Sequence, residues 1–141
     1  KAAEAGVAYV SKDELFAGSD VVSIHLVLSD RTRGLVSAAD LSRMKEASVL
    51  VNVSRGPIVD EKALLSALKA GRPGHAALDV YDREPLPGDH ALRKLENVTL
   101  SPHLGYVNAE NYRMFYRDSV ENVAAWIAGT PVRVLNPEAL A

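Results

Sequence analysis

Three residues with complementary chemistry stand beside turn residues in separate parts of the chain: Arg55, Glu84 and His103. Arg55 precedes Gly56 in a predicted strand-to-helix turn, where a planar guanidinium can bind a carboxylate through two parallel hydrogen bonds. An imidazole side chain is suited to proton transfer near neutral pH, so His103 could give or take the proton of a hydroxyl being oxidised or a carbonyl being reduced. Glu84 could bond the second ring nitrogen of this histidine, fix its tautomer and favour its protonated form.

Each of the three also has an ordinary structural explanation. Arg55 could pair with a structural carboxylate or be solvated, His103 could be a histidine without a catalytic role, and Glu84 could be a loop carboxylate in water. Only their shared position at predicted strand ends favours the combined interpretation.

The elements that would position these residues follow an alternating pattern of apolar runs and helical segments, which predicts an α/β fold with a Rossmann-type parallel sheet flanked by helices. Polar residues come directly after most of the runs, and the carboxyl ends of parallel strands face one crevice, where ligands bind. The predicted strands are Val7–Val10, Val21–Ile24, Val49–Val51, Ala76–Leu78 and Val98–Leu100.

Helix signals lie between these runs. Ser11 with Glu14 is a capping box for a short helix to Ala17, and Ser37 can cap a helix over Ala38–Met44. Asp60 can cap a helix that places Ala63, Leu64, Ala67 and Leu68 on one face. The longest predicted helix starts after Asn108, carries apolar residues every three or four positions from Tyr112 to Ile127, and stops at Gly129 and Pro131.

Composition excludes several classes of protein. The chain has 141 residues, a net charge of -2 and no Cys, so it can hold no disulfide, thiolate nucleophile or zinc-thiolate site. Near-neutral charge argues against a nucleic-acid groove or a polybasic membrane surface. No stretch is apolar enough to span a membrane, and we expect a soluble, cytoplasmic protein.

Motifs of other chemistries are missing. Ser54 lies in no G-x-S-x-G elbow, and the sequence has neither H-E-x-x-H nor a P-loop, so a hydrolase or a metal site has little support. G-x-G-x-x-G is also missing, and with it the loop that would hold a dinucleotide pyrophosphate. His75 and His90 read as ordinary surface or turn residues.

Three ordered blocks of sequence closely resemble the NAD-dependent D-2-hydroxyacid dehydrogenases, which include phosphoglycerate, glycerate, lactate and formate dehydrogenases. The blocks are Val51–Glu61, then Ala76–Val80 with Glu84-Pro85, and then Pro102–Gly105. The resemblance extends from about Val7 to Asn136.

The resemblance implies roles for individual residues. In the family, the Arg of the N-x-S-R-G block binds the substrate carboxylate and the His of the P-H-x-G block is the acid/base, which points to Arg55 and His103. The Glu before Pro supports the histidine, which points to Glu84. The Asp that opens the second block contacts the nicotinamide carboxamide, which points to Asp79.

The resemblance also implies a wider set of cofactor contacts. The loop after the second predicted strand usually reads H-x-P-L and lies beside the cofactor, and here Val27 replaces the usual Pro. The implied cofactor-binding residues are His25, Leu26, Val53, Ser54, Arg55, Asp79, His103 and Gly105.

Family members carry a substrate domain and the glycine-rich βαβ portion ahead of the part that this sequence matches. We therefore expect residues 1–129 to be the carboxyl-terminal part of an NAD-binding Rossmann-type domain and residues 130–141 a tail returning toward a substrate domain. The resemblance implies NAD as cofactor, a small 2-hydroxy or 2-oxo acid as substrate, and a homodimer. Two alternatives stay open: an NAD(H)-binding interaction module of the corepressor type, and a fragment without activity.

Overall fold

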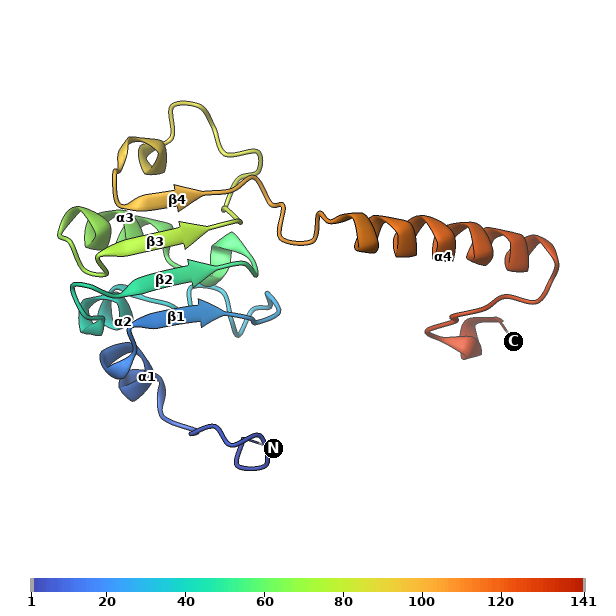
Figure 1. The fold of residues 1–141 in the computed structure, drawn as a ribbon, viewed down its shortest axis with the longest axis horizontal. Coiled ribbons are helices and arrows are strands. Elements are labelled where there is room, and N and C mark those ends of the chain that lie inside the picture. The colour runs from blue at the N-terminus through green and yellow to red at the C-terminus, as the bar shows by residue number, and fades with distance from the viewer. Residues whose placement is uncertain (1, 141) are drawn as a thin grey trace. The chain divides into compact units, whose positions relative to one another are not determined.

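Four short strands form one parallel sheet in the order β1-β2-β3-β4 (Figure 1). The computed structural model describes residues 2–140. This arrangement confirms the predicted parallel α/β architecture and four of the five predicted strands. The strands are β1 (Val21–Ile24), β2 (Val49–Asn52), β3 (His75–Leu78) and β4 (Val98–Leu100).

The predicted strand at Val7–Val10 is wrong. Within residues 2–140 this segment pairs with no strand, and its apolar side chains are exposed, Tyr9 to 93%. A strand forms only when a neighbour accepts and donates its backbone hydrogen bonds, and the sheet of the described residues ends at β1. An apolar run alone does not supply that neighbour.

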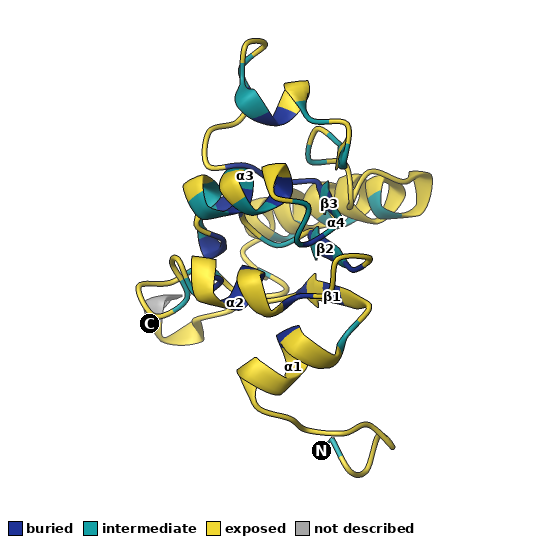
Figure 2. Cartoon of the chain, turned by 90° about the vertical axis from the view of Figure 1, so that its left-hand side faces the viewer, coloured by how far each residue is buried: buried dark blue, intermediate teal, exposed yellow. Residues whose placement is uncertain are grey.

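Burial alternates along the first three strands, because successive side chains of a strand point to opposite faces. One face carries Val22, Leu50 and Ala76, which pack in a single cluster with residues of the helices α1 (Lys12–Gly18), α2 (Ala38–Arg43) and α3 (Glu61–Lys69). Figure 2 shows the buried residues gathered in the strands and in these helices. The helices therefore cover one face of the sheet.

The predicted caps start the helices. Ser11 and Glu14 form the capping box of α1, Ser37 and Asp40 form that of α2, and the Asp60 carboxylate accepts from the Ala63 N–H at 3.0 Å. Helix α1 ends one residue later than predicted, and α2 one residue earlier.

A separate compact unit begins at Tyr106, and the first unit ends at Gly105. The unit that begins at Tyr106 contains helix α4 (Ala109–Ile127), which Asn108 caps as predicted, and none of the helix residues is buried. Arg133 of the following segment donates to Asn122 at 3.0 Å, so that segment folds back along α4. The predicted domain division at residue 129 stays a prediction.

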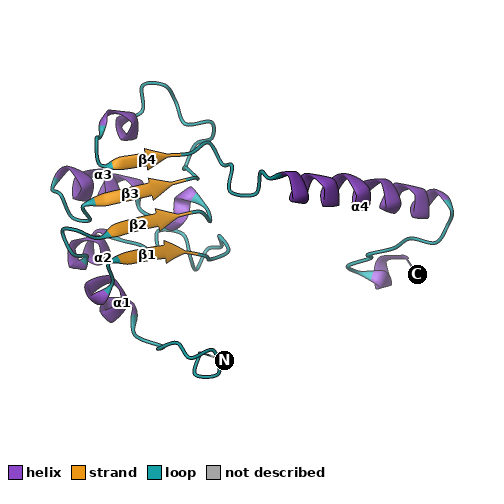
Figure 3. Ribbon diagram, viewed as in Figure 1, coloured by secondary structure: helices purple, strands orange, loops and turns teal. Residues whose placement is uncertain are grey.

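Three short 3-10 helices complete the described chain, at Gly56–Ile58, Ala91–Lys94 and Pro137–Leu140 (Figure 3). Helix α4 is the longest helix, yet neither it nor any other helix within residues 2–140 is long and apolar enough to cross a membrane.

Gly56 lets two loops at the carboxyl ends of the strands approach closely. A Cβ atom at this position would overlap the backbone of Tyr81 and Asp82, whereas one at Gly88 would meet nothing. The turn after β2 and the segment after β3 can therefore lie together only because residue 56 has no side chain.

We expect Gly56→Ala to lower the free energy of unfolding by about 1–3 kcal/mol, because the new methyl group must push backbone atoms apart. Urea denaturation of the variant, with Gly88→Ala as the matched control, measures this loss. Equal stability of both variants and the parent would contradict the close approach.

Candidate active site

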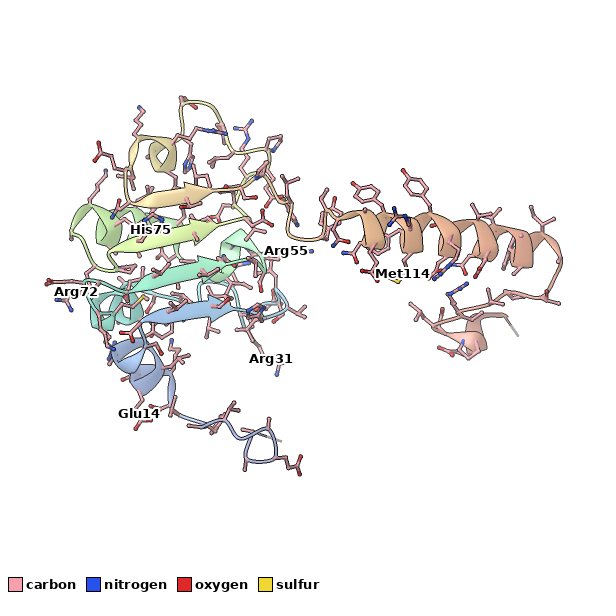
Figure 4. The ribbon with its side chains drawn as sticks, viewed as in Figure 1. Glu14, Arg31, Arg55, Arg72, His75 and Met114 are labelled. Carbon is pink, nitrogen blue, oxygen red and sulfur yellow. The ribbon has the colours of Figure 1, made fainter. Side chains whose placement is uncertain are left out.

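The polar residues that follow the strands lie at the carboxyl-end edge of the sheet. In Figure 4 Arg55 lies beyond the tip of β2, whereas His75 lies at the opposite, amino-terminal edge. His75 is the first residue of β3 and contacts the Thr99 hydroxyl at 2.9 Å, so it belongs to the sheet and not to a turn. It takes no part in the candidate site.

His103 and Glu84 form a hydrogen-bonded pair. Nδ1 of His103 lies 2.7 Å from Oε2 of Glu84, and each side chain is about one-third exposed, 35% in both cases. Burial raises the pKa of the Glu84 carboxyl, but the hydrogen bonds from His103 and from the Tyr81 N–H outweigh it and hold this pKa below its usual value. The positive charge of Arg55 also lowers the pKa of Glu84.

Asp79 fixes the loop that carries His103. Its Oδ1 accepts from the Leu104 N–H and its Oδ2 from the Gly105 N–H, both at 2.8 Å. Burial raises the pKa of Asp79, yet these bonds and one from Ser101 hold it below its usual value. The buried carboxylate therefore binds the backbone on the carboxyl-terminal side of His103.

His103 itself has a left-handed backbone conformation, with φ 58°. Such a conformation costs an L-residue about 1–2 kcal/mol and needs surrounding contacts to hold it. The Asp79 bonds supply part of that restraint and aim the imidazole at Glu84.

The turn after β2 is held by Asn52, which is 1% exposed. Its side-chain amide donates to the Arg55 carbonyl at 2.9 Å, and its side-chain oxygen accepts from the Ser54 N–H at 3.1 Å. The Ser54 hydroxyl in turn donates to the Ile24 carbonyl at 2.8 Å, which ties this turn to the end of β1. Arg55 thus projects from a braced turn, with its own side chain exposed.

A shallow depression lies beside Arg55 at the ends of β1 and β2. Its lining includes the predicted cofactor residues His25, Leu26 and Ser54, together with Val27. Leu26 and Val27, after β1, are exposed, and so is Val53 in the turn after β2. Apolar surface is therefore available for a flat ring beside polar atoms. These apolar side chains, together with the polar groups of His25 and Ser54, fit a nicotinamide or adenine ring. Nε2 of His25 lies 2.8 Å from the Ser23 hydroxyl.

Two contributors were not given roles from the sequence: Asn52 and Tyr81. Asn52 stands directly after a buried apolar run, and a buried side-chain amide at that position must form hydrogen bonds with the backbone. Its role in the turn could therefore have been predicted from the sequence. The Tyr81 hydroxyl contacts the carbonyls of Ser101 and Leu78 at 2.8 and 3.0 Å, and no local sequence pattern predicts these contacts. His90, expected at the surface, is half-buried and bonds Glu61 at 3.2 Å.

We expect Asp79→Asn to lower the free energy of unfolding at pH 7 by about 1–3 kcal/mol. Since the pKa of Asp79 is depressed in the folded protein, the stability it contributes is present above its ordinary value of 3.8 and is lost as pH falls through the folded value. Urea denaturation at pH 7 and pH 3 should show that the difference in free energy of unfolding between the parent and Asp79→Asn is smaller at pH 3. The exposed Asp89→Asn serves as control. A difference that does not change with pH would refute the stabilising role of the Asp79 carboxylate.

Comparisons with known proteins place this chain in a family. Residues 1–105 match the sequence model described as D-isomer specific 2-hydroxyacid dehydrogenase, NAD binding domain. A glyoxylate reductase of Korarchaeum cryptofilum is 42% identical over 136 residues, which is 96% of this chain and 41% of the relative. The chain thus spans about two-fifths of that relative's length.

Solved structures agree. An oxidoreductase from Ralstonia solanacearum superposes with a TM-score of 0.91 at 44% identity, covering 99% of this chain and 41% of that one. A D-isomer specific 2-hydroxyacid dehydrogenase from Xanthobacter autotrophicus Py2, solved with NADPH and MES, gives 0.69 at 39% identity, over 86% of this chain and 49% of that one. The chain belongs to the D-isomer-specific 2-hydroxyacid dehydrogenase family and contains part of its Rossmann-type NAD-binding domain.

Proposed function

We propose that the protein interconverts a D-2-hydroxy acid and its 2-oxo acid by NAD(H)-dependent hydride transfer. The observation that carries the proposal is the 2.7 Å hydrogen bond between Nδ1 of His103 and Oε2 of Glu84. An acid/base pair at the same edge of the sheet as an arginine that can bind a carboxylate suits a substrate that bears a carboxylate beside its reacting carbon.

In this proposal Arg55 anchors the substrate carboxylate. Its Nη1 donates to the Ser54 carbonyl at 2.7 Å, which orients the guanidinium, and a guanidinium has five N–H donors in all. A planar fork of this kind matches the two oxygens of a carboxylate.

His103 is the acid/base and Glu84 its positioning residue. Because Nδ1 is bonded to Glu84, the proton passes to and from the substrate oxygen at Nε2. Reduction of a 2-oxo acid needs an imidazole that carries the proton to be given to the substrate oxygen, and the hydrogen bond to Glu84 holds the ring in place.

The depression lined by His25, Leu26, Val27, Ser54 and Arg55 would hold the cofactor. The family resemblance adds Val53, Asp79, His103 and Gly105 as cofactor contacts. When bound, the nicotinamide supplies or accepts the hydride. Both oxygens of Asp79 already accept backbone N–H bonds, but a carboxylate oxygen has a second lone pair, so Asp79 can also accept from the cofactor carboxamide.

The corepressor-type binding module gains no support, since the relatives named above are a reductase, an oxidoreductase and a dehydrogenase. The homodimer and the cytoplasmic location stay predictions, which light scattering and cell fractionation can check.

Which 2-oxo acid is used is best decided by an NADH-oxidation assay of the protein made from the complete gene. Its panel should include glyoxylate, hydroxypyruvate, pyruvate and phosphohydroxypyruvate, and NADH binding without reduction of any acid would favour the binding module.

We expect His103→Ala in this protein to lower kcat by about 10²-fold or more, because the transition state loses its proton donor. NADH binding, followed by fluorescence titration, should stay within about twofold. His75→Ala, at the opposite edge of the sheet, is the control. Unchanged turnover of the His103 variant would eliminate the acid/base assignment.

We expect Arg55→Ala to raise the KM for the 2-oxo acid about 10- to 100-fold, because a charge-assisted bidentate contact is lost. Arg31→Ala provides the control, since that arginine is also exposed at the carboxyl-end side of the sheet (Figure 4). Steady-state kinetics at saturating NADH measure both variants. If both raise KM equally, general attraction between charges explains the effect and the anchor role fails.

A further inference from the structure

The buried side chain of Tyr81 joins the end of β3 to the loop that carries His103. Its hydroxyl lies 2.8 Å from the Ser101 carbonyl and 3.0 Å from the Leu78 carbonyl, so its single hydrogen is shared between these two acceptors. Ser101 stands two residues before His103. The tyrosine is only 8% exposed, so water does not compete readily for these bonds.

The backbone of the same residue holds the partner of the histidine. The Tyr81 N–H donates to Oε1 of Glu84 at 2.9 Å, while the other carboxylate oxygen, Oε2, contacts His103. One residue therefore restrains both members of the pair, Glu84 through its main chain and the loop before His103 through its hydroxyl.

The loop needs restraint on both sides of His103 because that residue is left-handed, with φ 58°. On the carboxyl-terminal side, Asp79 accepts from the N–H groups of Leu104 and Gly105. On the amino-terminal side, the Ser101 N–H donates to the Leu78 carbonyl at 2.9 Å, and the Ser101 carbonyl accepts from Tyr81. The Tyr81 hydroxyl is thus the side-chain counterpart of the Asp79 carboxylate.

We propose that the hydroxyl of Tyr81 is a positioning group that holds His103 in register with Glu84. The proposal rests on the acid/base role of His103 given above, and Tyr81 is not a catalytic residue because its hydroxyl is bonded to backbone carbonyls. Burial raises the pKa of Tyr81, so the phenol stays protonated, as a donor must, over the working range of the enzyme.

The test is Tyr81→Phe in the protein made from the complete gene. Phenylalanine keeps the buried ring and the backbone N–H to Glu84 and removes only the hydroxyl. We expect kcat for 2-oxo acid reduction to fall about fivefold, with the KM values for NADH and the acid within about twofold, because one net hydrogen bond is lost. The dependence of the rate on pH should also change, because the hydrogen bond between Glu84 and the imidazole of His103 is disturbed.

Two control variants separate positioning from stability. Tyr116→Phe removes a hydroxyl from an exposed position in α4 and should change nothing. Leu68→Val weakens the core beneath α3, far from His103 in the sequence, and should lower the melting temperature without moving the pH profile. If Tyr81→Phe keeps both the parent's kcat and its pH profile, or matches Leu68→Val in every readout, the positioning role is overturned.

A spectroscopic measurement keeps the proposal testable if the parent protein reduces no acid, which would itself overturn the proposed function. The proton between His103 and Glu84 should give a downfield ¹H NMR signal that is missing in His103→Ala. We expect this signal to weaken or shift in Tyr81→Phe and to persist in Tyr116→Phe. An identical signal in Tyr81→Phe would refute the positioning role independently of activity.

Discussion

The left-handed backbone of His103 is the constraint around which the site is organised. An L-residue adopts this conformation against its own steric preference, so the neighbouring chain must restrain it from both directions. The restraints come from the end of β3 and the residues that follow it: the Asp79 carboxylate on one side, and Leu78 and Tyr81 on the other. The imidazole then meets Glu84 at a hydrogen-bond distance of 2.7 Å.

Burial and hydrogen bonding act in opposite directions on the two carboxylates of this arrangement. Burial alone would raise the pKa values of Asp79 and Glu84, yet both lie below their usual values because N–H groups and His103 act on both, and Arg55 acts on Glu84. Both acids therefore stay ionised where they hold the loop.

Much of this fold could be predicted from the sequence because its signals are local. Helix caps such as Ser11 and Asp60 bond to groups three residues away, and an apolar run bounded by polar residues predicts a strand, correctly for four of the five runs. The Val7–Val10 run fails as a strand because pairing depends on a neighbour, which no local pattern encodes. Helix α4 has a regular apolar period, yet none of its residues is buried, since periodicity states which face is apolar and not what covers it.

The site shows the same division. Arg55, Glu84 and His103 could be proposed as site residues from residue type and from their position after strands, and the structure brings Glu84 and His103 into contact. Asp79 was expected to face the cofactor, and its bonds to Leu104 and Gly105 join residues 25 and 26 positions apart, which only the folded sheet brings together. The Tyr81 hydroxyl could not be predicted for that reason: its partner carbonyl belongs to a loop 20 residues away.

The segment from Leu78 to Glu84 supplies every hydrogen bond described here for the loop from Ser101 to Gly105. Because these bonds share one short stretch of backbone, a local opening that displaces that stretch releases them together. The two segments consequently form one cooperative unit, whose amide protons would exchange with solvent in a single opening event. Motion at this edge of the sheet would therefore switch the hydrogen-bonded pair of His103 and Glu84 between assembled and disassembled states, with little population of a partly aligned imidazole.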